Sequence, residues 1–173
     1  MKIDPCRQFS GEFVIPGDKS ITHRAVMLNA APEAEALVTN ALLGEDCLST
    51  ASCMRALGAE VAVEGNCIRV KGTRKFRSAD LYCGNSGTTM RLLMGLVSGR
   101  GVNARLTGDD SLSRRPMERV AAPLRLLGAD IRTQNGCAPV EIAAARLCGA
   151  RVDTRVASAQ VKSAVILAAL GAE

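Results

Sequence analysis

Three short segments combine small polar residues with basic side chains, and each lies where a predicted strand runs into a predicted helix. They are PGDKSITHR (16–24), GNSGTTMR (84–91) and ASAQVKS (157–163). The first N–H groups of a helix lack intrahelical partners and carry partial positive charge, so they favour an anion. The nearby cations are Lys19, Arg24, Arg91 and Lys162. Together the segments predict one anion-binding site, although each alone is also typical of an ordinary helix cap beside a solvated cation.

A fourth basic segment, DDSLSRRPMER (109–119), precedes another predicted helix. The guanidinium groups of Arg114 and Arg115 have the fork geometry that fits a carboxylate or a phosphate. Pro116 suits the first turn of the helix that follows. The alternative is a solvated basic loop whose helix is capped by Ser111 or Ser113.

The composition favours a small acidic substrate as the ligand. The chain has 173 residues and a net charge of +5, and 47% of its residues are apolar. Aromatic residues make up only 2%, which leaves hardly any surface for base stacking, so we expect no nucleic acid partner. No apolar run reaches the length of a transmembrane helix, so we expect no membrane partner either.

The seven cysteines predict a reduced, cytoplasmic protein without a metal site. Their number is odd and no C-x-x-C motif occurs, so we interpret them as mostly buried, apolar side chains. A histidine-based zinc site is not expected, because His23 is the only histidine. We interpret His23 itself as a hydrogen-bond partner near Lys19 rather than as a catalytic base.

The chain repeats itself with a period close to 70 residues. Leu57 and Leu127 are 70 residues apart, and so are Cys67 and Cys137. The repeat predicts two units, about 10–72 and about 73–148, and the start of a third at 149–173. Completing the third unit would take roughly 50 more residues, so we expect the chain to be part of a longer protein.

Each unit is predicted to have the element order β-α-β-α-β-β, which indicates an α/β fold. The predicted strands before the hairpins are 12–16, 36–39, 80–84 and 103–107. The predicted helices are about 20–31, about 46–57, about 87–98 and about 117–127, with Ser20 and Ser86 at the first-helix starts and Gly58 and Gly128 after the second helices. The hairpins turn at EGN and QNG. In the third unit, 151–156 is predicted as a strand and a serine-capped helix follows it.

Taken together, the motifs PGDKS, GNSGTTMR, SLSRRPM and SAQVKSA resemble those of bacterial 5-enolpyruvylshikimate-3-phosphate synthases. This resemblance implies a prism fold of two domains, each with three such units. It implies transfer of the enolpyruvyl group of phosphoenolpyruvate to the 5-hydroxyl of shikimate 3-phosphate by a monomeric enzyme, without metal or organic cofactor. The proton-transferring carboxyl groups of the family belong to the second domain, so residues 1–173 are expected to carry half of the site and to be inactive alone.

The resemblance also implies roles for individual residues. The shikimate 3-phosphate ligands it implies are Lys19, Ser20, Arg24, Ser158 and Gln160. The phosphoenolpyruvate ligands it implies are Lys19, Asn85, Gly87, Arg115 and Gln160. It leaves the roles of Arg91 and Lys162 open. A methyl group at position 87 is expected to enter the space of phosphoenolpyruvate, and of glyphosate more strongly.

Two alternatives remain at this point. UDP-N-acetylglucosamine enolpyruvyl transferases have the same fold, but they have Lys-Asn where this chain has Lys19 and Ser20. They also usually have a reactive cysteine in the loop that corresponds to 109–116, where this chain has none. The second alternative is a non-catalytic module that binds anions. Binding of shikimate 3-phosphate would separate it from the enzyme.

Overall fold

A computed structural model describes residues 8, 10–154 and 157–172 of the chain. Its helices are α1 (Lys19–Ala30), α2 (Glu45–Ala56), α3 (Gly87–Arg100), α4 (Asp110–Ser113), α5 (Glu118–Leu126) and α6 (Ala159–Ala169). Its strands are β1 (Glu35–Val38), β2 (Glu60–Glu64), β3 (Cys67–Lys71), β4 (Ala79–Tyr82), β5 (Ala104–Thr107), β6 (Asp130–Gln134) and β7 (Cys137–Ala143).

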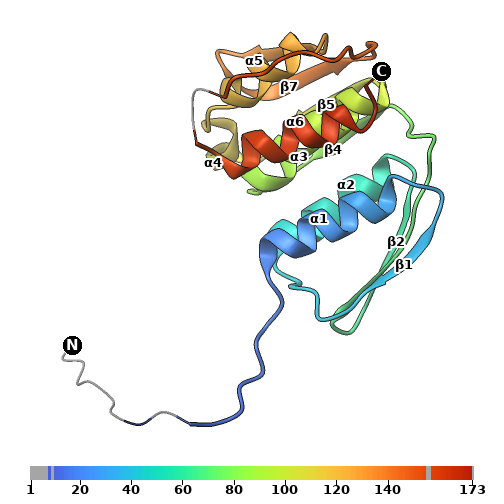
Figure 1. Cartoon of the computed structure of the whole chain (residues 1–173), viewed down its shortest axis with the longest axis vertical. Helices are drawn as coiled ribbons and strands as arrows, with labels where there is room; N and C mark the ends of the chain where they lie inside the picture. The colour runs from blue at the N-terminus through green and yellow to red at the C-terminus, as the bar shows by residue number, and fades with distance from the viewer. Residues whose placement is uncertain (1–7, 9, 155–156, 173) are drawn as a thin grey trace.

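Two sheets lie on the outside of the molecule and the helices pack between them (Figure 1). The first sheet has the order β1-β3-β2 and the second has the order β4-β5-β7-β6. In both sheets a hairpin pairs antiparallel with the preceding strand, and β4 adds a parallel edge strand to the second. The strand orders β1-β3-β2 and β5-β7-β6 therefore correspond, which agrees with the predicted repeat, and the two sheets with their helices confirm the α/β class.

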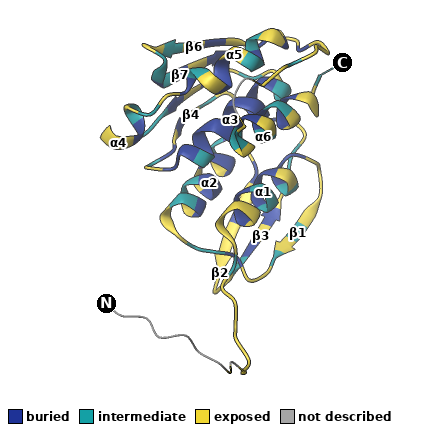
Figure 2. Cartoon of the chain, turned by 60° about the vertical axis from the view of Figure 1, so that its left-hand side comes forward, coloured by how far each residue is buried: buried dark blue, intermediate teal, exposed yellow. Residues whose placement is uncertain are grey.

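The helix α3 forms the centre of the core. Nearly all of its residues up to position 98 are buried, and they include Leu92, Leu93 and Met94 (Figure 2). A helix that is apolar on all sides needs other elements around it. Here α2, α5 and α6 all pack against α3, so the first turn of α3 is held in a fixed place relative to both units.

The approach of α6 to α3 depends on glycine. A Cβ atom on Gly95 would overlap the carbonyl oxygen of Ala164, and one on Gly99 would lie 2.6 Å from the carbonyl oxygen of Ala168. Both contacts are with backbone, which cannot move aside as a side chain can. The close approach therefore fixes the position of α6 along α3.

We expect Gly95→Ala to destabilise the fold by about 1–3 kcal/mol, because overpacking a tight core contact forces the backbones apart. Thermal unfolding would register this as a loss of roughly 2–4 °C per kcal/mol. Gly149→Ala is the matched control, since a Cβ at Gly149 meets no atom within 4 Å. Equal melting temperatures for the two variants would contradict this account of the helix contact.

Two helix starts agree with the prediction and one differs. Ser86 and Ser158 cap α3 and α6, each accepting a hydrogen bond from a backbone N–H of the first turn. The first helix is capped by Asp18 instead of Ser20, because the Asp18 carboxylate accepts from the N–H of Ile21 at 2.7 Å. Ser20 consequently lies inside α1 with its side chain at the exposed start of the helix.

Two predicted strands are absent from the described residues. Residues 12–16 form no strand, and Val14 is 99% exposed. A strand needs a partner for its backbone groups, and no described strand lies beside this segment. Residues 151–154 likewise form no strand, whereas 155–156 lie outside the described part of the chain. Both segments have sequence patterns typical of strands, but a strand forms only where another strand is available to pair with it.

The second helix of the second unit also begins differently from the prediction. A separate turn, α4, covers 110–113 and is capped by Asp109, whose carboxylate accepts from the N–H of Leu112. The following helix α5 starts only at Glu118, after Pro116 and the capping residue Met117. The predicted caps Ser111 and Ser113 therefore lie within α4, and the loop that contains Arg115 connects two helices.

Candidate anion-binding site

The starts of α1, α3 and α6 face one region of the molecule. All three helices begin on the left-hand side of Figure 1 and run side by side. Arg24 of α1 donates from Nη2 to Ser163 Oγ of α6 at 2.8 Å. Gln160 of α6 donates from Nε2 to Thr88 Oγ1 of α3 at 3.0 Å. The three motifs singled out in the sequence are thus brought together through side-chain contacts.

On the α1 side, the site contains a lysine and an arginine with different partners. Lys19 Nζ lies 2.9 Å from Asp46 Oδ2, at the start of α2, and this carboxylate raises the pKa of Lys19. Arg24 also donates to the backbone oxygen of Ser20 at 2.9 Å. Lys19 is therefore positively charged but partly neutralised, and Arg24 ties the first turn of α1 to α6.

On the α3 side, Asn85 and Arg115 form one polar cluster. Arg115 donates from Nη2 to Asn85 Oδ1 and, at 3.3 Å, to Ser111 Oγ. Asn85 Nδ2 donates to Asp109 Oδ2 at 2.6 Å. The backbone N–H of Leu112 and then the Asn85 amide lower the pKa of Asp109, so Asp109 is ionised at neutral pH and serves as an acceptor. Arg114, the other predicted fork, is exposed, and in the described residues its side chain makes no hydrogen bond or ion pair with this cluster.

Arg91 is a buried cation with neutral acceptors. It is 5% exposed. Its Nη1 donates to Gln160 Oε1 at 2.9 Å and its Nη2 donates to the backbone oxygen of Pro116 at 3.1 Å. Burial, and then the charges of Arg119 and Arg115, lower the pKa of Arg91 to about 10, so it remains protonated at neutral pH. No carboxylate of the described residues pairs with Arg91, so its charge adds to the positive potential at the start of α3.

Gly87 lies under these guanidinium groups. A Cβ atom at Gly87 would lie 2.8 Å from Arg91 Nη1 and 3.4 Å from Arg115 Nη1. The missing side chain therefore makes room for two cations at the start of α3. From the sequence, the space above Gly87 was expected to hold a ligand. In the structure the guanidinium groups of Arg91 and Arg115 occupy part of that space.

The α6 side presents a hydroxyl group and an amide. The Ser158 hydroxyl oxygen accepts from the N–H of Val161, which leaves its O–H able to donate. The Gln160 amide is bonded on both ends, by Arg91 and by Thr88. Ala159 and Lys162 are exposed beside them.

Beneath the site, a chain of buried polar side chains connects three helices. His23 Nδ1 lies 2.6 Å from Thr50 Oγ1, which lies 2.7 Å from Thr89 Oγ1. Thr89 Oγ1 in turn donates to Ser86 Oγ at 2.7 Å. His23 Nε2 has no hydrogen-bond partner among the described residues. The interpretation of His23 as a hydrogen-bond partner near Lys19 agrees with this position, although its partner is Thr50.

We expect His23 to make stability pH-dependent. Burial is the main reason that the His23 pKa is lowered from 6.5 to about 4. The charge of Asp46 raises this pKa, whereas the charges of Lys19 and Arg24 lower it further. Between these two values the unfolded chain binds more protons, so stability should fall as the pH falls from 6.5 to 4. The full difference is on the order of 3 kcal/mol.

Chemical denaturation at pH 7 and at pH 4.5 would measure this loss. His23→Gln is the control, because it keeps a polar side chain but cannot titrate. The difference in unfolding free energy between wild type and His23→Gln should shrink or reverse as the pH is lowered. A difference that does not change with pH would show that His23 is not buried in its neutral form.

Four residues of the site were missed in the sequence: Asp46, Thr88, Asp109 and Ser163. Asp46 and Asp109 open helices, where acidic residues are ordinary, so their type alone carried no signal. Thr88 and Ser163 lie within the quoted motifs, but their partners lie on other helices. Thr88 and Ser163 could have been identified only with knowledge of which helices pack against one another.

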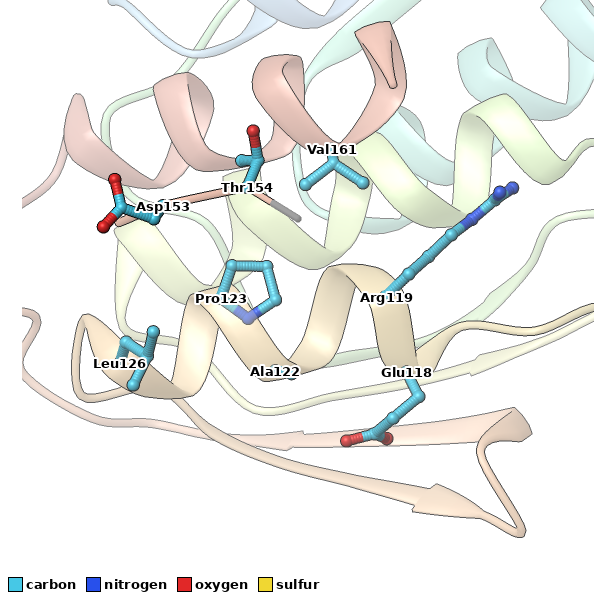
Figure 3. Close-up of a pocket in the computed structure, with 8 residues that line it drawn as sticks. All are labelled: Glu118, Arg119, Ala122, Pro123, Leu126, Asp153, Thr154 and Val161. Atoms are coloured by element: carbon cyan, nitrogen blue, oxygen red, sulfur yellow. The ribbon is translucent and has the colours of Figure 1, made fainter. Parts of the chain in front are cut away.

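A hollow in the surface lies elsewhere. It has a volume of about 500 Å³ and lies between α5 and α6, with most of its lining apolar (Figure 3). Glu118 and Asp153 also line it, and Figure 3 shows Glu118 pointing toward the β6–β7 hairpin. The two carboxylates outnumber the one cation there, Arg119, which disfavours a phosphate, and none of the ligand-binding residues implied by the motifs lines the hollow. The cation cluster, rather than this hollow, is the candidate site.

The described residues contain no cluster of side chains arranged to hold a metal ion. They also contain no helix with the length and apolarity that crossing a membrane requires. The described cysteines are all free, but the prediction that most are buried is only half right. Cys47, Cys53 and Cys83 are buried, whereas Cys67, Cys137 and Cys148 are partly or fully exposed. Cys6 lies outside the described residues.

Comparisons with known proteins agree on one family. The model of the family described as EPSP synthase (3-phosphoshikimate 1-carboxyvinyltransferase) matches residues 3–173. A 3-phosphoshikimate 1-carboxyvinyltransferase of Roseiflexus sp. (strain RS-1) is 49% identical and is matched over 97% of this chain and 40% of its own length. One of Gloeobacter violaceus is 50% identical, over 99% of this chain and 41% of its own length.

The fold has a close counterpart among solved structures. The EPSP synthase of Acinetobacter baumannii superposes with a TM-score of 0.90 at 44% identity, over 94% of this chain and 38% of that one. The chain thus spans about 40% of the length of the relatives that it matches.

Proposed function

The chain belongs to the EPSP synthase family, and on that basis we propose that it binds shikimate 3-phosphate and phosphoenolpyruvate at the starts of α1, α3 and α6. Together with the further sequence that its relatives have, it transfers the enolpyruvyl group of phosphoenolpyruvate to the 5-hydroxyl of shikimate 3-phosphate. The reaction releases inorganic phosphate. We also propose that the complete enzyme is a cytoplasmic monomer, and the free cysteines support a reducing compartment.

The observation that carries this proposal is the cluster of cations at the start of α3, where Arg115 and Arg119 lie near the buried Arg91. Among the described residues Arg91 itself has only neutral acceptors, so no carboxylate cancels the positive potential of the cluster there. Arg115 and Arg119 are near enough to lower the pKa of Arg91, so the repulsion among the three cations favours binding of an anion. The N–H groups at the start of α3 add to the same field.

The residues divide into two sides. We propose that Lys19, Ser20, Arg24, Ser158 and Gln160 bind shikimate 3-phosphate. We propose that Lys19, Asn85, Gly87, Arg115 and Gln160 bind phosphoenolpyruvate. The contacts support this division, because Arg24 bonds to α6 and Arg115 bonds to the loop before α3. Lys19 and Gln160 belong to both sides of this proposed division.

The chemistry explains the need for so many cations. Both substrates carry a phosphate and a carboxylate, so fixed positive groups must offset the repulsion between them. The 5-hydroxyl oxygen forms the new C–O bond, the C–O bond to phosphate breaks, and the hydroxyl proton leaves, overall, with the phosphate. Asp109 is an unsuitable proton donor because its pKa is lowered. We therefore propose that residues in the further sequence carry the acid and base steps.

Calorimetric titration of residues 1–173 with shikimate 3-phosphate tests the binding. We expect saturable binding of shikimate 3-phosphate and none of UDP-N-acetylglucosamine. Binding of inorganic phosphate with the same affinity as shikimate 3-phosphate would instead favour an anion-binding module. Binding of neither phosphate nor shikimate 3-phosphate would contradict the site.

Phosphate release from both substrates tests the activity. We expect none from residues 1–173, and turnover on the order of 10 per second from the chain extended by the remaining sequence of the Roseiflexus relative. Turnover of the same size by residues 1–173 would contradict the proposed division of the active site.

A further inference from the structure

Arg91 connects the two sides of the site. Its side chain leaves α3, and its Nη1 reaches Gln160 on α6 while its Nη2 reaches the carbonyl oxygen of Pro116. Pro116 follows Arg115 directly. The planar guanidinium fixes both distances at once, because its N–H groups have a rigid fork geometry. One side chain thus holds a residue on the shikimate 3-phosphate side and the loop on the phosphoenolpyruvate side.

The contact with Arg91 also decides which end of the Gln160 amide faces the start of α3. Arg91 has only donors, so it binds the amide oxygen. The amide nitrogen then points to Thr88, in the first turn of α3. Its NH₂ group has a second hydrogen beyond the one donated to Thr88. A reversed amide would present oxygen there and repel an anion.

We propose that Arg91 is a positioning residue that holds Gln160 as a hydrogen-bond donor and, through Pro116, fixes the loop that contains Arg115. The identity of the anion, shikimate 3-phosphate, rests on the proposed function. The positioning itself rests on the two contacts of a side chain that is 5% exposed.

Gly87 is part of the same arrangement. Because a Cβ at Gly87 would lie 2.8 Å from Arg91 Nη1, an alanine there must push the guanidinium away from Gln160. The end of an arginine side chain can move, so Gly87→Ala should leave the fold intact. It should release the Gln160 amide just as removal of Arg91 does.

A double-mutant cycle on residues 1–173 tests the coupling between Arg91 and Gln160. The measurement is the dissociation constant for shikimate 3-phosphate. Arg91→Met and Gln160→Leu should each weaken binding about tenfold, which corresponds to ~1.4 kcal/mol. The double variant should also be weaker by about tenfold, because Arg91 acts through Gln160. A loss of roughly a hundredfold in the double variant would mean independent roles and would overturn the proposal.

Two further variants separate positioning from charge and from stability. Arg91→Lys keeps the charge but lacks the fork, so it should bind nearly as weakly as Arg91→Met; full affinity would overturn the proposal in favour of a charge effect. Arg100→Met is the matched control on the same helix. Arg100 donates to the backbone oxygen of Ala31 at 2.8 Å, remote from the motifs, so its loss should lower the melting temperature and leave affinity within about twofold. A similar loss of affinity in Arg91→Met and Arg100→Met would mean that Arg91 only stabilises the fold, and it would overturn the proposal.

A second cycle needs no ligand and so distinguishes a failure of this inference from a failure of the proposed function. In wild type, Gly87→Ala should lower the melting temperature by about 3 °C, because it displaces Arg91. In the Arg91→Met background, Gly87→Ala should lower the melting temperature by less, or should raise it, since alanine favours a helix more than glycine does. Equal effects in the two backgrounds would overturn the contact, whatever the chain binds. If Gly87→Ala has different effects in the two backgrounds but the wild type does not bind shikimate 3-phosphate, only the proposed function is contradicted.

Discussion

Replacing Lys19 by alanine is expected to lower kcat/KM about 30- to 150-fold, which corresponds to ~2–3 kcal/mol of lost transition-state stabilisation. The enzyme for this measurement is the chain extended by the remaining sequence of the Roseiflexus relative. Lys19 is the first residue of α1, and its ammonium group is exposed beside Asp46. Lys19 and Gln160 are the two residues assigned to both substrates, and Lys19 is the charged one, so its loss affects every charged complex along the reaction.

Lys162→Ala is the matched control for Lys19→Ala. Lys162 is also exposed and lies near the start of α6, but it is assigned to neither substrate. Its replacement should change kcat/KM by less than about threefold, or ~0.7 kcal/mol. The same small change for Lys19→Ala would reject its assignment. Asp46→Asn should have the opposite sign, because removing the partner carboxylate makes the site more positive and should tighten binding of both anions.

The sequence predicted the elements that depend on local chemistry. Gly58 and Gly128 have φ of +112° and +94° after the second helices, and the hairpins turn where EGN and QNG were found. These positions need glycine or asparagine for reasons internal to the turn. The repeat then placed the helix starts at equivalent positions, and this was enough to predict the convergence of the three motifs.

The sequence could not predict contacts that depend on packing. Arg91 and Gln160 are 69 residues apart, and nothing in either motif indicates that they touch. The strand expected at 12–16 had a suitable pattern, but strand formation requires a neighbouring edge. Lys19 was recognised as a cation, whereas its partner Asp46 belongs to a different helix and was not considered. In each case the missing information is which surfaces face one another.

Replacing Arg115 by alanine is expected to separate the two sides of the site kinetically. In the extended enzyme, the KM for phosphoenolpyruvate should rise about 10- to 150-fold, as expected for the loss of a charged hydrogen bond worth ~1.5–3 kcal/mol. The KM for shikimate 3-phosphate should change by less than about threefold. The reason is local, because the Arg115 guanidinium bonds to Asn85 and lies over Gly87, whereas Arg24 bonds to Ser20 and Ser163.

Arg114→Ala provides the comparison for this experiment, since the two arginines are adjacent and carry the same charge. The Arg114 side chain is exposed and makes no hydrogen bond or ion pair within the described part of the chain, whereas its backbone oxygen accepts from the thiol of Cys137 at 3.6 Å. Its loss should leave both Michaelis constants nearly unchanged. If Arg114→Ala and Arg115→Ala raise the KM for phosphoenolpyruvate equally, the general positive potential of the loop binds the substrate, and no specific fork exists. If Arg115→Ala raises both Michaelis constants together, its guanidinium supports the whole site, and the assignment of Arg115 to phosphoenolpyruvate is wrong.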